Sequence, residues 1–292
     1  MNKFVKYENN PVFGNKEIGT CFDVYVTKKG DLYRMDFSWR PKKALAVIFS
    51  KDGINWSEPQ ITLESNPESG WEDNINRNCV LEVDGKYKMW YTGQANGESN
   101  IGYAESDDGI NFKRIQNEPV MICDRPWEKP SVMNPCVIYE NGIYKMWYAA
   151  GETYEPNVLA YAESKDGINW EKYGNEPIFM ADPNNVYEQN RVGGCQVIHT
   201  ADMGYLMFYI GYENIDKAQI CIARSDDGKT AWERSKLNPI VEPIPGEWDG
   251  DACYKPSFLW NEEENKWMLW YNGRKRDDEY IGYVYKNGRE LF

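Results

Sequence analysis

Two short patterns recur along the chain about every sixty residues, and such internal repetition constrains the fold more than any other feature. One pattern is an aromatic strand, found at residues 87–93, 144–148, 205–209 and 267–271 and more faintly at 33–37. The other is a turn that starts at a Ser and contains an Asp-Gly pair, found at residues 50–56, 106–112, 164–170 and 225–228. An Asp-Gly pair between alternating apolar runs indicates a tight hairpin, because Gly tolerates positive φ. The chain is therefore predicted to repeat one all-β unit.

Each unit is expected to contain four strands, which in the second copy fall at residues 79–83, 87–93, 101–105 and shortly before 117–120. Four antiparallel strands repeated radially form a propeller blade. The last unit stops after its third strand at 281–285, and residues 4–12 offer the missing strand from the other end of the chain. We therefore predict a five-bladed β-propeller in which the N-terminal strand completes the last blade. Residues 1–292 would form a single domain.

The composition narrows the class of partner. Lys and Arg total 33 against 46 Asp and Glu, which gives a net charge of −13. Such an acidic surface repels phosphate backbones and anionic lipid, so we expect neither nucleic acid nor a membrane as partner. The N-terminus lacks an apolar run of signal-peptide length, and the seven Cys, an odd number without a CxxC pair, indicate free thiols. These features favour a cytoplasmic protein and leave its oligomeric state open.

The connections between strands fall into two sets. Those between the first and second strands and between the third and fourth are short and alike, whereas those between the second and third vary, at residues 92–100, 151–157, 211–217 and 272–279. Variable loops on a rigid scaffold usually carry binding residues, so we expect the functional site on their face. The only histidine, His199, is expected in a turn on the other face, which argues against a Ser/His triad or a His-based metal site.

An aromatic residue followed by an acid recurs in four of the loops that lead from one unit to the next. The pairs are Trp71-Glu72, Trp127-Glu128, Tyr187-Glu188 and Trp248-Asp249. A feature repeated in four units favours a structural staple between neighbouring units, and a carboxylate collar around an axial pocket is the alternative. Both interpretations could hold together, with one or two of these acids recruited to chemistry.

Residues that break the repeat are stronger candidates for chemistry. Asp23 begins the first strand of the first unit, where the matching strand starts carry Asn78, Pro135 and Pro256. Just upstream lie unlike polar groups that suit a small polyhydroxylated ligand, namely Arg77, Asn134, Arg191, Asp251 and Lys255. Sugar-stacking faces would come from Trp39, Trp71 and Trp127. Arg40 and Arg274 are further candidate substrate contacts.

The remaining motifs give little sign of cofactor chemistry. Cys79, Cys136 and Cys195 fall at the same place in three units, which predicts core packing rather than a zinc cluster. The sequence has no phosphate loop and no dinucleotide fingerprint. We expect no cofactor and no metal site built from His or Cys, while the acidic loops leave an oxygen-ligated cation open.

The repeated Tyr-Lys-Met-Trp-Tyr strands and Ser-x-Asp-Gly-x-Asn-Trp turns resemble the five-bladed propeller glycosidases of glycoside hydrolase families 43, 32 and 130. In family 43 the general base is an Asp that precedes a Gly-Asp-x-Tyr turn, and Asp23 precedes Gly30-Asp31-Leu32-Tyr33 by seven residues. The resemblance thus implies this role for Asp23. The other two carboxylates of that family would fall at Cys79 and Met133, so the general acid would have to be Glu128, Asp73 or Glu188. Family 130 often uses phosphate as nucleophile, and Glu72-Asp73 with Arg77 loosely resembles its motif.

Together these features favour a glycoside hydrolase-like enzyme that cleaves a small oligosaccharide or glycoside in an axial pocket, using paired carboxylates. One alternative is a glycoside phosphorylase or transglycosidase, with Arg77, Arg191 and Lys255 holding phosphate. The other is a non-catalytic propeller that binds carbohydrate. A carbohydrate is the expected ligand in each case.

Overall fold

The computed structural model describes residues 4–152 and 156–292, which form almost entirely antiparallel β-sheet. The helices within these residues are short 3-10 turns, namely η1 (Arg40–Lys42), η2 (Pro67–Ser69), η3 (Pro126–Glu128) and η4 (Val186–Glu188). In this part of the chain, none of them has the length and apolar character that a membrane-crossing helix needs. The prediction of an all-β fold with almost no helix is confirmed.

The strands form antiparallel units in which each strand pairs with the next along the chain. Unit 1 contains β2 (Cys21–Lys29), β3 (Leu32–Trp39), β4 (Ala44–Ser50) and β5 (Gln60–Glu64). Unit 2 contains β6 (Asn74–Val83), β7 (Lys86–Ala95), β8 (Glu98–Ser106) and β9 (Lys113–Arg114). Unit 3 contains β10 (Ser131–Glu140), β11 (Ile143–Gly151), β12 (Val158–Ser164) and β13 (Glu171–Lys172), with the short β14 (Phe179–Met180) also paired to β12.

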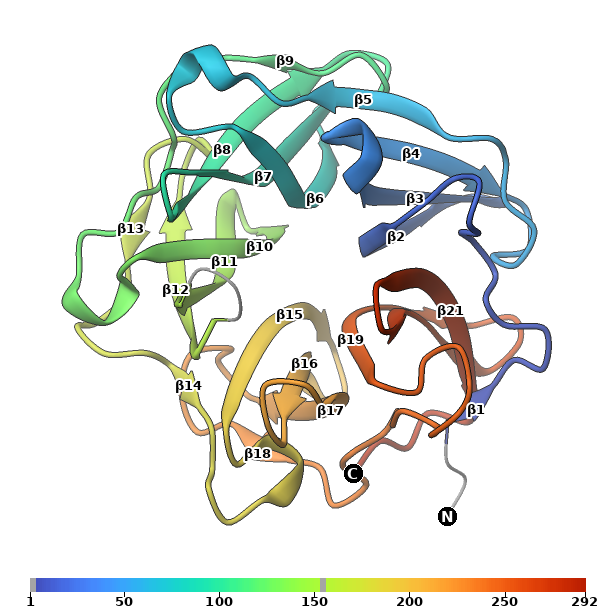
Figure 1. Cartoon of the computed structure of the whole chain (residues 1–292). Helices are drawn as coiled ribbons and strands as arrows, with labels where there is room; N and C mark the ends of the chain where they lie inside the picture. The colour runs from blue at the N-terminus through green and yellow to red at the C-terminus, as the bar shows by residue number, and fades with distance from the viewer. Residues whose placement is uncertain (1–3, 153–155) are drawn as a thin grey trace.

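Unit 4 contains β15 (Arg191–Thr200), β16 (Gly204–Tyr212), β17 (Ala218–Ser225) and β18 (Glu233–Arg234). Unit 5 contains β19 (Ala252–Asn261), β20 (Lys266–Lys275) and β21 (Asp278–Asn287), with β1 (Val5–Lys6) at its outer edge. Figure 1 shows the units arranged around a common centre, with β2, β6, β10, β15 and β19 innermost. Units 2 and 3 form one nine-stranded sheet, because Ser131 of β10 makes a parallel pair with Ser99 of β8.

The N-terminal segment joins the last unit, as the sequence predicted. Val5 and Lys6 pair antiparallel with Tyr285 and Val284 of β21. Phe13 forms a further bridge with Ile281 of the same strand. The two ends of the chain thus share one sheet, and the outer edge of β21 is covered.

Two of the expected variable loops are largely strand, so this part of the loop prediction was wrong. Strands β7 and β8 extend to Ala95 and from Glu98, and the turn between them is Asn96-Gly97 with φ of 55° and 80°. Positive φ at both central residues is the requirement of a two-residue hairpin turn, which Asn-Gly meets. Strands β20 and β21 likewise approach within two residues of each other, so residues 272–279 are mainly a hairpin. Side chains of both hairpins are therefore carried on rigid strands.

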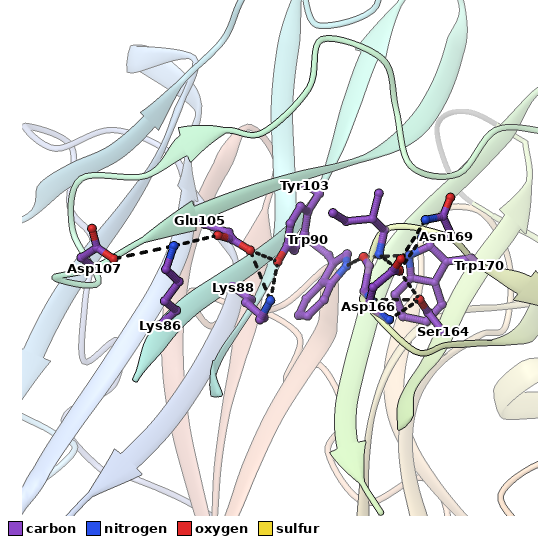
Figure 2. A network of polar contacts seen from close by, with 12 residues as sticks. Lys86, Lys88, Trp90, Tyr103, Glu105, Asp107, Ser164, Asp166, Asn169 and Trp170 are labelled. Atoms are coloured by element: carbon purple, nitrogen blue, oxygen red, sulfur yellow. Dashed lines mark hydrogen bonds and ion pairs between the residues drawn. The ribbon is translucent and has the colours of Figure 1, made fainter. Parts of the chain in front are cut away.

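The two sequence repeats meet in the contact that joins neighbouring units. Figure 2 shows Trp90 of β7 beside the turn of unit 3, where its indole N–H donates to the Gly167 carbonyl at 2.7 Å. Asp166 shapes that turn by accepting hydrogen bonds from the Asn169 and Ile168 backbone N–H groups. The same contact recurs between Trp147 and Gly228, at 2.7 Å. Each Trp is fully buried, so the repeat fixes neighbouring units through packing and one hydrogen bond.

Two further contacts of this kind join other neighbouring units. Trp270 of unit 5 donates to the Gly53 carbonyl of unit 1 at 2.7 Å, which ties the last unit to the first. In unit 1 the position of the Trp is taken by Asp36, whose carboxylate pairs with Arg34 at 2.6 Å. Arg34 then donates to the Gly109 carbonyl of unit 2 at 2.6 Å. The fainter first copy of the repeat thus makes the same inter-unit contact with different residues.

We expect Trp147→Phe to lower the free energy of unfolding by about 1–3 kcal/mol more than Trp56→Phe, because it leaves a buried carbonyl without its donor. The indole nitrogen of Trp56 is buried without a partner, so the control removes a similar volume but no hydrogen bond. Urea denaturation of both variants measures the difference. Equal losses would show that the indole hydrogen bond contributes nothing beyond packing.

Candidate functional site

A β-bulge interrupts the first strand of every unit where that strand approaches the centre. At each bulge the first strand has one residue more than the second strand to which it pairs. The bulges lie between the paired positions Phe22/Tyr25, Asn76/Cys79, Met133/Cys136, Gly193/Cys195 and Tyr254/Ser257. A bulge redirects a side chain, and such bulges are frequent next to active sites.

Four bulges hold a polar residue in the left-handed backbone conformation. These residues are Asp23 (φ 59°), Arg77 (φ 55°), Asn134 (φ 55°) and Lys255 (φ 48°). Asp and Asn adopt this conformation readily, but Arg and Lys do so at a cost of about 1–3 kcal/mol, which is typical of functional positions. The sequence alignment of the units was therefore wrong by one residue: Asp23 corresponds to Arg77, Asn134 and Lys255 themselves, not to the residues after them.

The fourth unit differs, because its bulge carries Gly194 and no side chain. A Cβ atom at Gly194 would lie 2.6 Å from the Cγ of Asn134, so the Asn134 side chain occupies that space. Asp23, Asn134 and Lys255 are each only 3% exposed. Units 1, 2, 3 and 5 thus contribute one polar bulge residue each, and unit 4 leaves room for the Asn134 side chain of unit 3.

A polar side chain of the preceding unit satisfies the backbone N–H that three of these bulges release. The Asp23 N–H donates to Asn272 Oδ1 at 2.8 Å, the Arg77 N–H to Ser38 Oγ at 3.0 Å, and the Asn134 N–H to Thr92 Oγ1 at 3.1 Å. A buried N–H without a partner would be costly, so these contacts fix the bulges in place. The ring of units therefore sets the position of each bulge side chain.

The Asp23 carboxylate is oriented by two neighbours. Ser38 Oγ donates to its Oδ2 at 3.3 Å, and the Arg77 Nε lies 4.0 Å from its Oδ1. Arg77 in turn donates to Asn76 Oδ1 at 2.8 Å. A cavity of about 260 Å³ opens beside this cluster, with Phe22, Arg40, Arg77 and Gln94 among its lining residues. The carboxylate is thus held beside a cation at the edge of a small hollow.

A second carboxyl group, Glu279 of β21, lies close to Asp23 and was not among the expected site residues. It is 7% exposed, and its Oε2 lies 3.3 Å from the Arg40 guanidinium without a hydrogen bond. Burial raises the pKa of Glu279, and the nearby charge of Asp23 raises it further. Residues 272–279 were expected to be a loop, so nothing in the sequence indicated that this side chain faces unit 1. The hairpin signal is weak here, because the turn residues Arg276-Asp277 are not a typical hairpin pair.

Several buried polar atoms near the bulges have no hydrogen-bond partner within the described residues. They are Asn134 Oδ1, Glu279 Oε2 and both amide atoms of Asn78. Buried polar atoms in proteins are usually hydrogen-bonded, so each such atom calls for an explanation. A polyhydroxylated ligand at the centre could supply partners to those that face it.

Three cysteines lie beneath this cluster on neighbouring innermost strands. Cys79 Sγ accepts a hydrogen bond from the Val137 N–H at 3.2 Å, and Cys136 Sγ accepts one from the Val197 N–H at 3.2 Å. Burial raises the pKa of Cys79, Cys136 and Cys195 to about 12, so the thiols stay protonated. Within residues 4–152 and 156–292, no three His, Cys, Asp or Glu side chains are grouped to hold a metal ion.

The repeated acids make buried contacts with groups other than Asp23. These contacts favour a structural role between neighbouring units over the catalytic role expected for Glu128 and Glu188. Both are 0% exposed. Glu128 accepts hydrogen bonds from the Tyr148 hydroxyl and from Lys172, each at 2.7 Å, and from two backbone N–H groups. Glu188 accepts from the Tyr209 hydroxyl and pairs with Arg234. Fully bonded carboxylates of this kind have no free oxygen for a substrate.

The other expected site residues are spread over the same face. Asp73 is exposed at the rim before β6. Trp39 donates to the Ile18 carbonyl, and Trp71 stacks on Tyr91 and donates to the Asn117 carbonyl. Both indoles are therefore held by structural contacts.

The remaining three expected residues contact groups other than Asp23. Arg191 pairs with Glu152 at 3.1 Å. Asp251 accepts a hydrogen bond from the Arg276 N–H at 2.6 Å. Arg274 donates to the Asp216 carbonyl at 2.9 Å and lines, with Asp251, a hollow of about 910 Å³ between units 4 and 5. Arg40 and Arg274 thus lie at two different hollows, and both act electrostatically on Glu279.

Comparison with known proteins assigns a family to this arrangement. The sequence matches the glycosyl hydrolases family 32 N-terminal domain over residues 31–176 and again over residues 136–289. The chain belongs to this glycosyl hydrolase family. Family membership agrees with the resemblance to propeller glycosidases that the repeats indicated.

Relatives and solved structures extend the comparison. An uncharacterized protein of Mycobacterium tuberculosis is 28% identical over 265 residues, which cover 84% of this chain and 85% of that protein. The 1,2-β-oligomannan phosphorylase of a Thermoanaerobacter species is 31% identical over 155 residues, 52% of this chain and 45% of the phosphorylase. A structure reported for the family 130 of mannoside phosphorylases and β-1,2-mannoside hydrolases superposes with a TM-score of 0.78 at 15% identity, covering 100% of this chain and 95% of that one. The structural likeness concerns the fold.

We expect Glu128→Gln to lower the free energy of unfolding by about 1–3 kcal/mol, because Lys172 would lose its buried anionic partner and keep only the exposed Asp124 carboxylate. Activity per folded molecule should not change. Asp73→Asn, at an exposed carboxylate on the same face, serves as the control and should leave the melting temperature unaltered. Loss of activity in a Glu128→Gln protein that remains folded would restore Glu128 as a catalytic candidate.

Proposed function

We propose that this chain cleaves glycosidic bonds at the centre of its ring, with Asp23 as the general base or nucleophile. The observation that carries the proposal is the convergence of Asp23, Arg77, Asn134 and Lys255 on equivalent left-handed bulges of four units. Backbone strain of this kind is retained where function requires it. Carboxylate, guanidinium and amide groups together suit hydroxyl-rich ligands.

We further propose that the units are the five blades of one propeller domain spanning residues 1–292. The nine-stranded sheet counts as two blades, because a single residue pair joins its halves. The pairing of β1 with β21 and the contact of Trp270 with Gly53 support closure of the ring. Asp23 then lies on the first blade, where the family resemblance implies the general base.

The proposed reaction requires Asp23 to be ionised and correctly aimed. Ser38 donates to Oδ2 and the Arg77 Nε lies 4.0 Å from Oδ1, so Oδ1 is the oxygen proposed to meet a water molecule or an anomeric carbon. The relatives named as acting on β-1,2-mannosides, and a plant β-fructofuranosidase 31% identical over 162 residues, suggest the substrates to test first. Oligosaccharides of mannose and fructose are therefore the leading candidates.

Asp23→Asn should reduce turnover by about 10²–10⁴-fold without loss of folding. Asn134 occupies the same backbone conformation in another unit, so an Asn at this position should fit without strain. The assay compares release from aryl furanosides, aryl pyranosides and β-1,2-mannosides, with Asp31→Asn, at an exposed turn, as the control. Turnover unaffected by Asp23→Asn would remove this residue from the mechanism. Saturable sugar binding without turnover by the wild type would instead favour a non-catalytic carbohydrate-binding protein.

Phosphorolysis is a second candidate, and one observation favours it. The Lys255 side chain is buried, and within the described residues no hydrogen bond or ion pair of its ammonium group is found. A buried cation is costly unless an anion compensates it. Inorganic phosphate bound at the centre would provide that anion and could act as the nucleophile.

If phosphate is the nucleophile, turnover should rise with phosphate concentration, and Lys255→Met should abolish that dependence. The exposed Lys236 provides the control variant Lys236→Met, which should behave as the wild type. Initial rates at increasing phosphate concentrations measure the effect. Identical rates with and without phosphate would exclude phosphorolysis and leave hydrolysis as the reaction.

A further inference from the structure

The hairpin of β20 and β21 places a carboxyl group opposite the Asp23 bulge. Asn272, whose side chain accepts the Asp23 N–H, pairs with Ile281 across the two strands. Glu279 lies two residues from Ile281, and alternate residues of a strand share a face, so Glu279 faces unit 1 as Asn272 does. Arg40 of unit 1 lies 3.3 Å from its Oε2. Two carboxyl groups of adjacent units therefore lie where unit 5 meets unit 1, close enough for the charge of Asp23 to act on Glu279.

The surroundings of Glu279 suit a group that holds a proton and then releases it. The side chain is buried, and its Oε2 is without a hydrogen-bond partner among the described residues. The charged and titratable groups that act on it are Arg40 on η1, Tyr254 on β19, Asp23 on β2 and Arg274 on β20. Burial is the largest influence and raises the pKa of the carboxyl, while the two arginines and Tyr254 lower it. A neutral carboxylic acid beside an ionised carboxylate is the pairing that glycosidic cleavage needs.

We propose that Glu279 is the general acid of the reaction whose base or nucleophile is Asp23. This inference rests on the function proposed above. In hydrolysis, water attacks the anomeric carbon and Asp23 accepts the proton of that water. The electron pair of the breaking C–O bond passes to the leaving oxygen, which takes the proton of Glu279. The products are two hydroxyl compounds, Asp23 is left protonated and Glu279 ionised, and exchange of protons with solvent restores both.

The assignment accounts for two features of the site. Arg40 lines the hollow between units 1 and 2, Arg274 lines the hollow between units 4 and 5, and both arginines act on Glu279, so a sugar chain that contacts either arginine would approach the acid. In the ion pair of Arg40 with Glu279, the arginine side chain is 57% exposed. Arg40 can therefore stabilise the carboxylate once its proton has left.

Glu279→Gln tests the assignment through the leaving group. Turnover of an unactivated oligosaccharide should fall by about 10²–10⁴-fold, because its leaving oxygen needs the proton. Turnover of the dinitrophenyl glycoside of the same sugar should fall less than about tenfold, because that leaving group departs as a stable anion. The decline of wild-type activity at high pH should also disappear in the variant. Asp278→Asn, exposed on the same strand, is the matched control.

Each outcome decides the assignment. Equal losses on both substrates, or no loss on either, would overturn it. Asp23→Asn should lose activity on both substrates. If it keeps activity on both, the proposed role of Asp23 is refuted, whatever Glu279→Gln shows. Absence of turnover of every glycoside by the wild type would refute both proposals.

A stability measurement provides a second readout that needs no substrate. A carboxyl whose pKa is raised on folding destabilises the protein above that pKa and has no effect below its ordinary value of about 4.3. Glu279→Gln should therefore raise the melting temperature at pH 8, by an amount that shrinks as the pH falls toward 4.3. A gain that does not vary with pH would contradict a proton held by Glu279 and overturn the assignment.

Discussion

Hydrogen bonds between the innermost strands of neighbouring units hold the centre of the molecule together. Each passes from a backbone N–H of one unit to a side chain of the unit before it: Val26 to Ser257, Val137 to Cys79, Val197 to Cys136 and Phe258 to Gln196. An innermost strand has no partner strand on its central side, so its N–H groups must be satisfied in this way. The distances, 2.6–3.2 Å, leave little freedom for one unit to shift against the next. The bulges lie on these same innermost strands, so the hydrogen bonds between units also fix where the bulge side chains lie.

The bulges use that rigidity for a different purpose. Left-handed backbone at Arg77 and Lys255 is unfavourable for a chain on its own, and it persists because the surrounding structure fixes it. Where the preceding unit offers Ser38, Thr92 or Asn272, a side chain satisfies the released N–H. Backbone geometry thus sets the positions of the acid, amide and cations of the bulges, and Arg77 also lies beside the Asp23 carboxylate.

The repeat unit could be read from the sequence because its signals are local. Asp-Gly turns and aromatic strands can each be recognised from a few adjacent residues. Once the repeat is known, the strand that the last unit lacks is also visible, and β1 supplies it. Asp23 could also be found, since it breaks the repeat. Glu279 could not, because its importance comes from a hairpin that turns it toward a residue more than two hundred positions away. The counterparts of Asp23 were misplaced by one residue for a similar reason: a bulge adds a residue without altering the hydrophobic pattern around it.

The carboxylates of this chain show how partners separate structural from chemical roles. Glu128 is surrounded by a tyrosine hydroxyl, a lysine and two backbone N–H groups, so both of its oxygens are occupied. Glu279 is nearly as buried, with Arg40, Arg274 and Tyr254 acting on it, but its Oε2 has no hydrogen bond. Burial raises the pKa of Glu279, which favours its neutral acid. A proton donor also needs an oxygen that a substrate can reach, whereas a structural contact occupies both oxygens. The number of donors around each carboxyl, rather than its residue type or its repeat position, therefore decides which function it can have.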